Sequence, residues 1–444
     1  MQRYRVLPSI RLMQCINIHP KAAEELGISM RKICFLRFGI ICTEVKVNIT
    51  DDININEIVL DEETITHLNI PLSINYEIKA TDFEIIIGPY IGLLIHKKQD
   101  TLDKYINAYK NYLTDYKSIG GAVIVFSVEG INQGSETVNG YLYNPINEEW
   151  VKGTYAYPTA LFKRIGINKS LRNHLHEKLG NAIFNEYILN KWEMYDWLSA
   201  TPELRCHLPE SILYKGQRDL LLFLTLHQIA YLKPISGSQG KGIIEIKNDG
   251  IKYYVNFIEQ KKCIEKEFYT VLDACIFINQ LINHRRYIIQ SGIKLIQTEG
   301  CKHDFRILVL KDDDGRWQDY GLVVRTGVKG SILSNISSGG IAEKGEQFLK
   351  QLELNAGEIF DLKYNMTRIA LEVANTIQKC GIHCGNLGID MGIDTNGYIW
   401  IIEVNSLDPN HTILLDAKLP QQFYLVKNAN MLYAKKLAGF GSGE

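Results

Sequence analysis

The segment from residue 388 to residue 405 places the tightest constraint on how this chain can fold. Two apolar runs flank Asn396-Gly397, and that dipeptide between apolar runs is a strong indication of a β-hairpin. If these two residues form the whole turn, Asp390 lies directly opposite Glu403. Asn405 follows Glu403 by two residues and shares its face, because side chains alternate along a strand. The segment therefore predicts a hairpin with two carboxylates and one amide on the same face.

This hairpin is a candidate metal site. Two carboxylates that face each other on a sheet repel, and a cation between them removes the repulsion. Carboxylate and amide oxygens are hard ligands suited to Mg²⁺, which keeps water or phosphate oxygens as its other ligands. Residues 386–405 therefore predict Mg²⁺ binding by Asp390, Glu403 and Asn405. A four-residue loop would shift the pairing but leave both acids on one face, and a solvated charged face is the alternative.

A glycine-rich loop between two predicted strands, residues 233–243, is a candidate phosphate site. After Lys233 the loop comprises Ser236, Gly237, Ser238, Gln239, Gly240, Lys241 and Gly242. Its glycines allow backbone N–H groups to approach an anion closely. It is neither a Walker A loop nor a dinucleotide fingerprint, because the required residues are missing and a strand follows. The loop therefore predicts phosphate binding, and an ordinary flexible hairpin turn is the alternative.

Two arginines accompany strongly apolar strands. In the strand predicted over residues 303–310, Asp304 and Arg306 lie on one face and Phe305 lies on the other. An arginine in such a strand is unfavourable unless it is paired, and a phosphate or a carboxylate satisfies it in a bidentate way. A structural pair with Asp304 or another acid is the alternative. Arg325 leads into a polar loop over residues 326–340, which could cover a substrate or lie on the surface.

Length and composition indicate several domains and exclude two classes of partner. The 444 residues exceed what one compact core contains. The net charge of -1 gives no bias towards nucleic acid or an anionic membrane. The apolar stretches, such as residues 85–95, are too short to span a bilayer, and the N-terminus has no signal-peptide core. We therefore expect a cytoplasmic protein that binds neither nucleic acid nor a membrane.

The order of the predicted elements divides the chain into three parts. Residues 1–80 are typical of a β-rich domain with short strands. Residues 81–185 alternate strands with helices, which indicates a small α/β domain. Residues 186–440 contain the glycine-rich loop and the carboxylate hairpin, and they end in a predicted helix. We therefore expect a mixed fold of the α+β and α/β classes.

These motifs, in this order, resemble the carboxylate–amine ligases of the ATP-grasp superfamily. More closely, the chain resembles the YheC/YheD family of endospore coat-associated proteins over nearly its whole length. Further segments that carry this resemblance are residues 36–39, 88–92, 190–193, 202–204, 208–210 and 315–317. The resemblance implies an ATP-grasp fold, in which two α+β subdomains clasp ATP, over residues 186–440. The α/β domain before it would be a pre-ATP-grasp domain.

The resemblance also implies roles for individual residues. Arg306 and Arg325 would be catalytic and hold the γ-phosphate or an acyl-phosphate. Asp390, Glu403 and Asn405 would bind Mg²⁺. The residues that would bind ATP, through the phosphates, the adenine hinge or the polar loop, are Lys191, Lys233, Ser236, Gly237, Ser238, Gln239, Gly240, Lys241, Gly242, Gln290, Ser291, Ile293 and Asn335.

The activity that the resemblance implies is a ligase that uses ATP and Mg²⁺. The carboxylate of a small molecule, a peptide or a spore-coat component would form an acyl-phosphate, and an amine would capture it, with ADP and phosphate as products. An association with spores and a homodimer are compatible with this activity. A kinase-like enzyme and a non-catalytic ATP-binding coat protein are the alternatives. After Asn405, residues 406–411 replace the usual Ser-Lys-Pro-Gly, which leaves substrate choice open.

Overall fold

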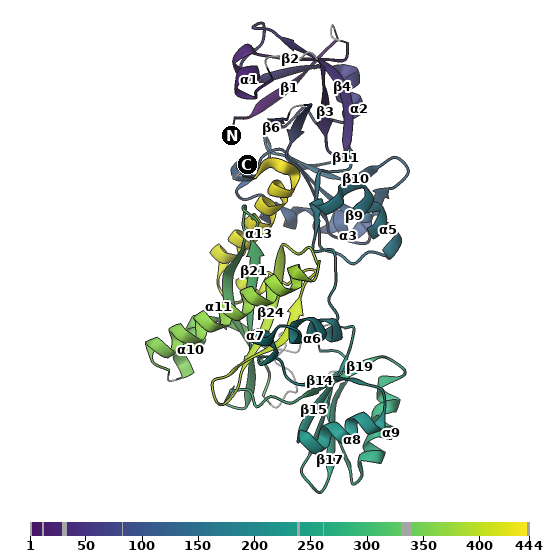
Figure 1. Cartoon of the computed structure of the whole chain (residues 1–444), viewed down its shortest axis with the longest axis vertical. Coiled ribbons are helices and arrows are strands. Elements are labelled where there is room, and N and C mark those ends of the chain that lie inside the picture. The colour runs from purple at the N-terminus through teal and green to yellow at the C-terminus, as the bar shows by residue number, and fades with distance from the viewer. Residues whose placement is uncertain are drawn as a thin grey trace.

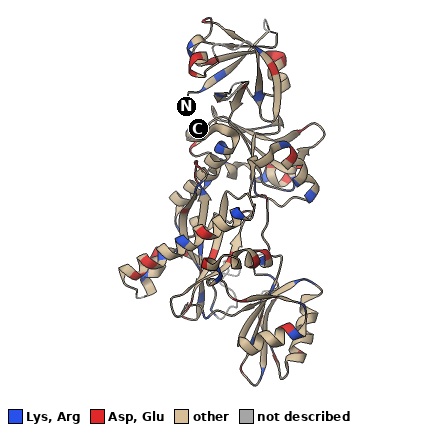
Figure 2. Ribbon diagram, in the orientation of Figure 1, with Lys and Arg blue, Asp and Glu red and all other residues tan. Residues whose placement is uncertain are grey.

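The described residues form four β-sheets arranged along the long axis of the molecule, with the last sheet in the chain placed between the second and the third (Figure 1). The computed structural model describes residues 2–10, 13–28, 33–81, 83–237, 240–260, 262–329, 340–352 and 354–441. Basic and acidic residues are interspersed over these elements (Figure 2). In this part of the chain, every helix is too short or too polar to cross a bilayer.

The first sheet is a closed barrel with the strand order β1-β5-β2-β4-β3-β7-β6. Strand β7 pairs with both β3 and β6, so the barrel continues past residue 80 to Gly88. Buried and exposed side chains alternate along several of its strands because only the inner face is packed. Its elements are β1 (Tyr4–Ser9), β2 (Cys15–Ile18), α1 (Pro20–Glu25), β3 (Ile33–Phe38), β4 (Ile41–Ile49), β5 (Glu57–Asp61), α2 (Glu62–Leu68), β6 (Asn75–Ala80) and β7 (Glu84–Gly88).

The second sheet has the order β11-β10-β9-β8-β12-β13. Its central strands β8 and β12 are buried along their whole length, because helices cover this part of the sheet. Its elements are β8 (Tyr90–Leu94), α3 (Gln99–Tyr105), η1 (Ile106–Tyr112), α4 (Tyr116–Ile119), β9 (Ala122–Asn132), β10 (Thr137–Asn144), β11 (Glu149–Ala156), β12 (Ala160–Lys163), α5 (Lys169–Leu179), η2 (Gly180–Ala182) and β13 (Ile183–Phe184).

The third sheet has the order β14-β19-β15-β16-β17-β18. Helices α8 and α9 bury their apolar faces against it and form a separate core. Two short helices, α6 and α7, precede it. The elements of this region are α6 (Lys191–Ser199), α7 (Pro202–Arg205), β14 (Ser211–Tyr214), α8 (Gln217–Leu226), β15 (Ile229–Pro234), β16 (Ile244–Asn248), β17 (Tyr253–Glu259), β18 (Lys262–Phe268), α9 (Val271–Ile282) and β19 (Tyr287–Ser291).

The fourth sheet has the order β23-β22-β21-β24-β25, with β20 paired to β21. The long helix α11 packs on one face, and α12 with α13 packs on part of the other. Its elements are β20 (Gln297–Thr298), β21 (Cys301–Lys311), β22 (Trp317–Thr326), β23 (Ile341–Lys344), α10 (Gly345–Leu349), η4 (Lys350–Leu352), α11 (Ala356–Lys379), β24 (Asn386–Ile393), β25 (Ile399–Asn405), α12 (Ile413–Asp416), α13 (Pro420–Lys435) and η5 (Lys436–Phe440).

Helix α13 joins the second and fourth sheets, and it lies between them in Figure 1. Phe423 and Val426 pack in the core on the fourth sheet. Met431 and Tyr433, later in the same helix, pack in the core of the second sheet. A helix that is apolar on several sides is buried on several sides. These contacts fix the second and fourth sheets against each other.

Strands β24 and β25 form the predicted hairpin, but the turn is longer than Asn396-Gly397. Ile393 pairs with Ile399, and the backbone N–H of Asp394 donates to the carbonyl of Tyr398 at 2.9 Å. The Asp394 carboxylate accepts a backbone hydrogen bond from Tyr398 at 3.0 Å. This side chain therefore closes a larger loop than the assumed two-residue turn.

A β-bulge in the same hairpin restores the predicted alignment of the two acids. Met391 pairs with Ile401, whereas the next pair along the strands is Asp390 with Glu403. Ile402 is therefore the extra residue, and it shifts the register by one. The longer turn alone would misalign the acids by one residue, and the bulge compensates for it.

Candidate functional site

A pocket between the third and fourth sheets collects most of the predicted site residues. Its walls come from the start of α6, the glycine-rich loop, β15, β19 and the strands β21, β22, β24 and β25. The predicted residues that line it are Lys191, Lys233, Gly237, Gly240, Lys241, Gln290, Ser291, Ile293, Arg325, Asp390 and Glu403.

The remaining predicted residues fall into two groups. Ser238, Gln239 and Asn335 lie outside the described residues. The others are described but do not line the pocket, and they are Ser236, Gly242, Arg306 and Asn405. Arg306 and Asn405 nevertheless belong to the site, because both side chains contact a carboxylate on its wall.

Five charged residues form a row across the fourth sheet, which we call the charge row: Arg325, Asp304, Arg306, Asp390 and Glu403. Arg325 pairs across the strands with Asp304, and Asp390 pairs with Arg306 on one side and Glu403 on the other. Arg306 donates to both Asp390 oxygens, at 2.7 and 2.8 Å. Arg325 lies 2.8 Å from Asp390 and also bonds Asp304. The side chains of Arg306, Arg325, Asp304 and Asp390 are buried.

The two arginines keep Asp390 ionised inside the protein. Burial alone would raise the pKa of this carboxyl, but the charges and hydrogen bonds of Arg306 and Arg325 hold its pKa below the ordinary value. A buried arginine can donate five N–H bonds, and Arg306 uses two of them on Asp390. The row therefore leaves guanidinium donors available for a further anion.

The donor set of the predicted metal site fits Mg²⁺. Asp390 and Glu403 supply carboxylates on facing strands, and the amide nitrogen of Asn405 donates to Asp390 at 3.4 Å, which places its amide oxygen at the same site. Among the described residues, Oδ1 of Asp390 accepts a hydrogen bond from Nε of Arg306 alone, while the other donors contact Oδ2. A carboxylate oxygen has about two lone-pair directions, so Oδ1 can also bind a metal. In this structure the Lys191 ammonium lies 3.2 Å from Glu403 and neutralises it. Oxygen ligands of this kind are the ones that Mg²⁺ prefers.

Two lysines face these acids from the other side of the pocket. Lys191, the first residue of α6, also donates to the carbonyl of Gly237 in the glycine-rich loop at 3.1 Å. Lys233, on β15, donates to the side-chain oxygen of Gln290. Burial lowers the pKa of Lys233 to about 8, although the charge of Glu403 opposes this shift. Both ammonium groups are placed to bind an anion in the pocket.

Several pocket residues were missed by the sequence analysis. Tyr231 and Lys302 line the wall, and their side chains meet at 3.2 Å. Tyr231 precedes Lys233 by two positions on β15, and Lys302 precedes Asp304 by two positions on β21. Because side chains alternate along a strand, the sequence could have placed both residues on the pocket face. Ile402 lines the pocket next to Glu403 because of the bulge, for which the local sequence gave no indication. Ile243 and Leu295 complete an apolar part of the wall.

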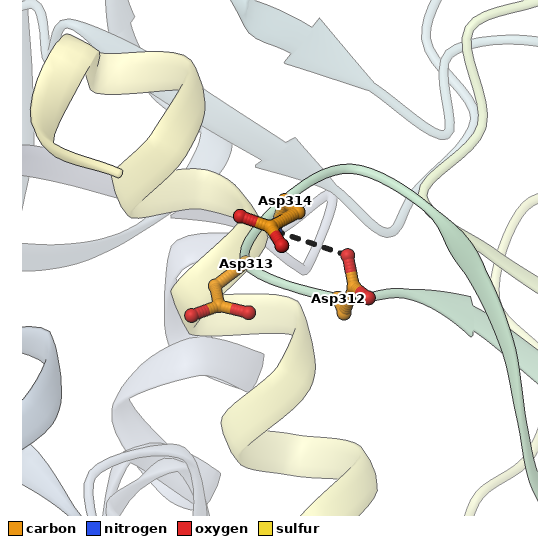
Figure 3. A group of neighbouring side chains, drawn as sticks. All are labelled: Asp312, Asp313 and Asp314. Carbon is orange, nitrogen blue, oxygen red and sulfur yellow. Dashed lines mark hydrogen bonds between the residues drawn. The ribbon is translucent and has the colours of Figure 1, made fainter. Parts of the chain in front are cut away.

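A second acidic group lies elsewhere in the fourth sheet. Asp312, Asp313 and Asp314 form a close cluster in the loop between β21 and β22 (Figure 3). The Asp312 carboxylate accepts backbone hydrogen bonds from Asp314 at 3.0 Å and Arg316 at 2.8 Å. The Arg316 guanidinium contacts both Asp312 and Asp314. These carboxylates stabilise a turn, on the order of 25 Å along β21 from the charge row.

The two facing acids should contribute very differently to stability. Asp390→Asn should destabilise the fold by about 3–5 kcal/mol, because two buried guanidinium groups lose a shared carboxylate. Glu403→Gln should cost less than about 1 kcal/mol, since the Glu403 side chain is 34% exposed. Urea unfolding of both variants beside the wild type measures the difference. An equal loss in the free energy of unfolding for the two variants would contradict this prediction.

Comparisons with known proteins identify the family. A model described as YheC/D-like ATP-grasp matches residues 180–437. The chain is 25% identical over 397 residues to endospore coat-associated protein YheD of Bacillus subtilis (strain 168), covering 86% of each chain. It is 22% identical over 333 residues to YheC of the same strain, covering 70% of this chain and 88% of the relative.

Among solved structures, the D-alanine-D-alanine ligase from Coxiella burnetii is similar with a TM-score of 0.42 and 10% identity, covering 79% of this chain and 96% of that chain. The family model spans more than half of the chain and includes the pocket and the charge row. The predicted family and its ATP-grasp fold are therefore confirmed. This chain belongs to the YheC/D-like ATP-grasp family.

Proposed function

We propose that this protein is a Mg²⁺- and ATP-dependent ligase that joins a carboxylate to an amine through an acyl-phosphate. The observation that carries the proposal is the convergence of cations and acids in the pocket between the third and fourth sheets. Lys191, Lys233 and Arg325 complement a polyphosphate, and Asp390 with Glu403 complements a divalent cation. A magnesium–nucleotide complex carries both kinds of charge.

The chemistry of the residues that line the pocket supports one orientation of ATP. The apolar part of the wall suits a base, and the lysines suit the phosphates. Gly237 and Gly240 of the glycine-rich loop line the pocket, and their backbone N–H groups would add donors for the phosphates. The apolar residues around the base would be Ile243, Ile293, Leu295 and Ile402.

The γ-phosphate would then lie at the charge row. Asp390 orients Arg306 and Arg325, whose unused N–H groups bind the transferred phosphoryl group. Mg²⁺ bound by Asp390, Glu403 and Asn405 would neutralise phosphate charge. Lys191, which neutralises Glu403 here, would turn to a phosphate once the metal takes over that role.

The reaction needs positioning and charge neutralisation more than a catalytic base. A carboxylate oxygen bonds to the γ-phosphorus while the bond from that phosphorus to the bridging oxygen breaks, and ADP leaves with the electron pair. The amine nitrogen bonds to the acyl carbon, phosphate leaves, and the nitrogen loses a proton. We take a small molecule or a peptide as the carboxylate substrate, and the names of the two Bacillus relatives make a spore-coat component a candidate.

Mg²⁺-ATP should stabilise the protein through Glu403. At 100 times its Kd, a ligand specific for the native state adds roughly 2.7 kcal/mol to the free energy of unfolding. We therefore expect a higher melting temperature with Mg²⁺-ATP for the wild type and a much smaller rise for Glu403→Gln. Thermal melting with ATP alone and with Mg²⁺ alone provides the controls. No shift in the wild type at millimolar nucleotide would favour a coat protein without nucleotide binding.

Hydroxylamine should trap the acyl-phosphate. We expect that Mg²⁺-ATP, hydroxylamine and an accepted carboxylate give a hydroxamate and ADP in equal amounts, and that Glu403→Gln gives neither. The measurement is a screen of amino acids, dicarboxylates and short peptides, read by ADP release and hydroxamate colour. ADP with a phosphorylated hydroxyl product and no hydroxamate would support the kinase-like alternative. Binding of Mg²⁺-ATP without ADP release from any member of the screen would contradict the ligase proposal.

A further inference from the structure

Four polar side chains that the pocket does not use meet beside α13. We call Arg164, Asp408, His411 and Lys427 the turn cluster, because two of them lie in the turn after β25. Arg164, directly after β12, donates two hydrogen bonds to the Asp408 carboxylate, each at 2.9 Å. On α13, Lys427 lies 2.9 Å from the Tyr112 hydroxyl and 3.4 Å from Nδ1 of His411. The cluster thus joins the second sheet, α13 and the turn.

Lys427 and His411 keep unused hydrogen-bond donors inside the protein. Lys427 is 6% exposed and His411 is 2% exposed. Within the described chain, no carboxylate forms an ion pair with Lys427, and Nε2 of His411 has no hydrogen-bond partner. Because Nδ1 of His411 faces the Lys427 ammonium, the ring proton belongs on Nε2. Buried donors of this kind are unfavourable unless a partner binds them.

The charges in the cluster do not balance. Arg164 pairs with Asp408 in a bidentate way, and no acid among the described residues forms an ion pair with Lys427. Burial, together with the charge of Arg164, lowers the pKa of Lys427 well below its ordinary value, and the more distant Asp408 opposes this shift. An additional anion beside Lys427 and His411 would restore the balance.

The turn cluster adjoins the charge row. Pro409, between Asp408 and His411, packs against Gly388 on β24, where an added Cβ would lie 2.8 Å from the Cβ of Pro409. The same point is 3.7 Å from Nε of Arg306. Arg306 therefore lies between the row and the turn, and an anion in the cluster would be close to the reacting groups.

We infer that Lys427 and His411 bind an anchoring carboxylate of the substrate, distinct from the carboxylate that reacts. This inference rests on the proposed ligase function, since it assigns an acidic substrate to that site. A single carboxylate can accept one hydrogen bond from the Lys427 ammonium and one from Nε2 of His411. The side chains of Asp408 and Arg164 are 31% and 14% exposed, so this pair marks the side from which the substrate enters.

A structural role for the cluster makes the opposite stability prediction. If Lys427 only tied α13 to the second sheet, its removal would lower the melting temperature. If Lys427 serves a ligand, its removal relieves an unpaired buried amine, and the melting temperature without ligand should stay the same or rise. Lys311 provides a matched control, because it is also 6% exposed and contacts a tyrosine hydroxyl, that of Tyr433, at 3.2 Å.

The test is thermal melting of the full chain with acetate and with acetamide, its neutral isostere, at matched ionic strength. Acetate should raise the melting temperature of the wild type in a saturable way, and acetamide should not. Lys427→Met should lose the acetate shift and keep the wild-type melting temperature or exceed it. Lys311→Met should keep the acetate shift. Mg²⁺-ATP, measured separately, should stabilise all three proteins.

Several results would overturn the inference. The first is a melting temperature of the wild type that acetate does not raise, or that acetamide raises equally. The second is a larger rise with inorganic phosphate than with acetate. The third is a rise with acetate that persists in Lys427→Met. A Lys427→Met protein that melts several degrees lower or does not fold would establish the structural role instead. The Mg²⁺-ATP measurement separates the two proposals, because its failure removes the ligase while the acetate comparison still decides whether the cluster binds a carboxylate.

Discussion

The Asp390 carboxylate, held between two buried guanidinium groups, is the interaction on which the site depends. It lies on the inner strand β24 and joins β24 to β21 and β22 through Arg306 and Arg325. Removing Asp390 leaves two buried guanidinium groups without the carboxylate that they share. Because Asp390 stays ionised, it fixes the orientation of both arginines, and in the proposed function it also binds the metal.

The two halves of the pocket come from separate sheets, and one ammonium group connects them. Lys191 bonds Gly237 in the loop of the third sheet and Glu403 on the fourth sheet. A bound magnesium–nucleotide complex would replace this bridge with contacts from phosphates and metal to the same groups. The helix α13 meanwhile holds the second sheet against the fourth, which places the turn cluster next to the charge row.

The sequence predicted the hairpin and the face that carries the acids, because the alternation of side chains along a strand is a local property. It predicted the family from motifs that occur in a recognisable order. Asp390 was predicted to lie opposite Glu403 on the assumption of a two-residue turn. The turn is longer than that, and the bulge at Ile402 restores the predicted pairing. The partners of the arginines required strand order, which a local pattern does not contain. The sequence left the partner of Arg306 open among a phosphate, Asp304 and another acid, and the structure pairs it with the Asp390 carboxylate. The role of Lys191 came from the family resemblance alone.

The most direct test of the account is a crystal structure with Mn²⁺ and a non-hydrolysable ATP analogue. The account predicts an anomalous peak at about 2.1 Å from carboxylate oxygens of Asp390 and Glu403, with the bonds from Arg306 to Asp390 still in place. It also predicts that Lys191 has moved from Glu403 to a phosphate. A bound nucleotide with no metal at this position, or with metal only at residues 312–314, would contradict the central claim.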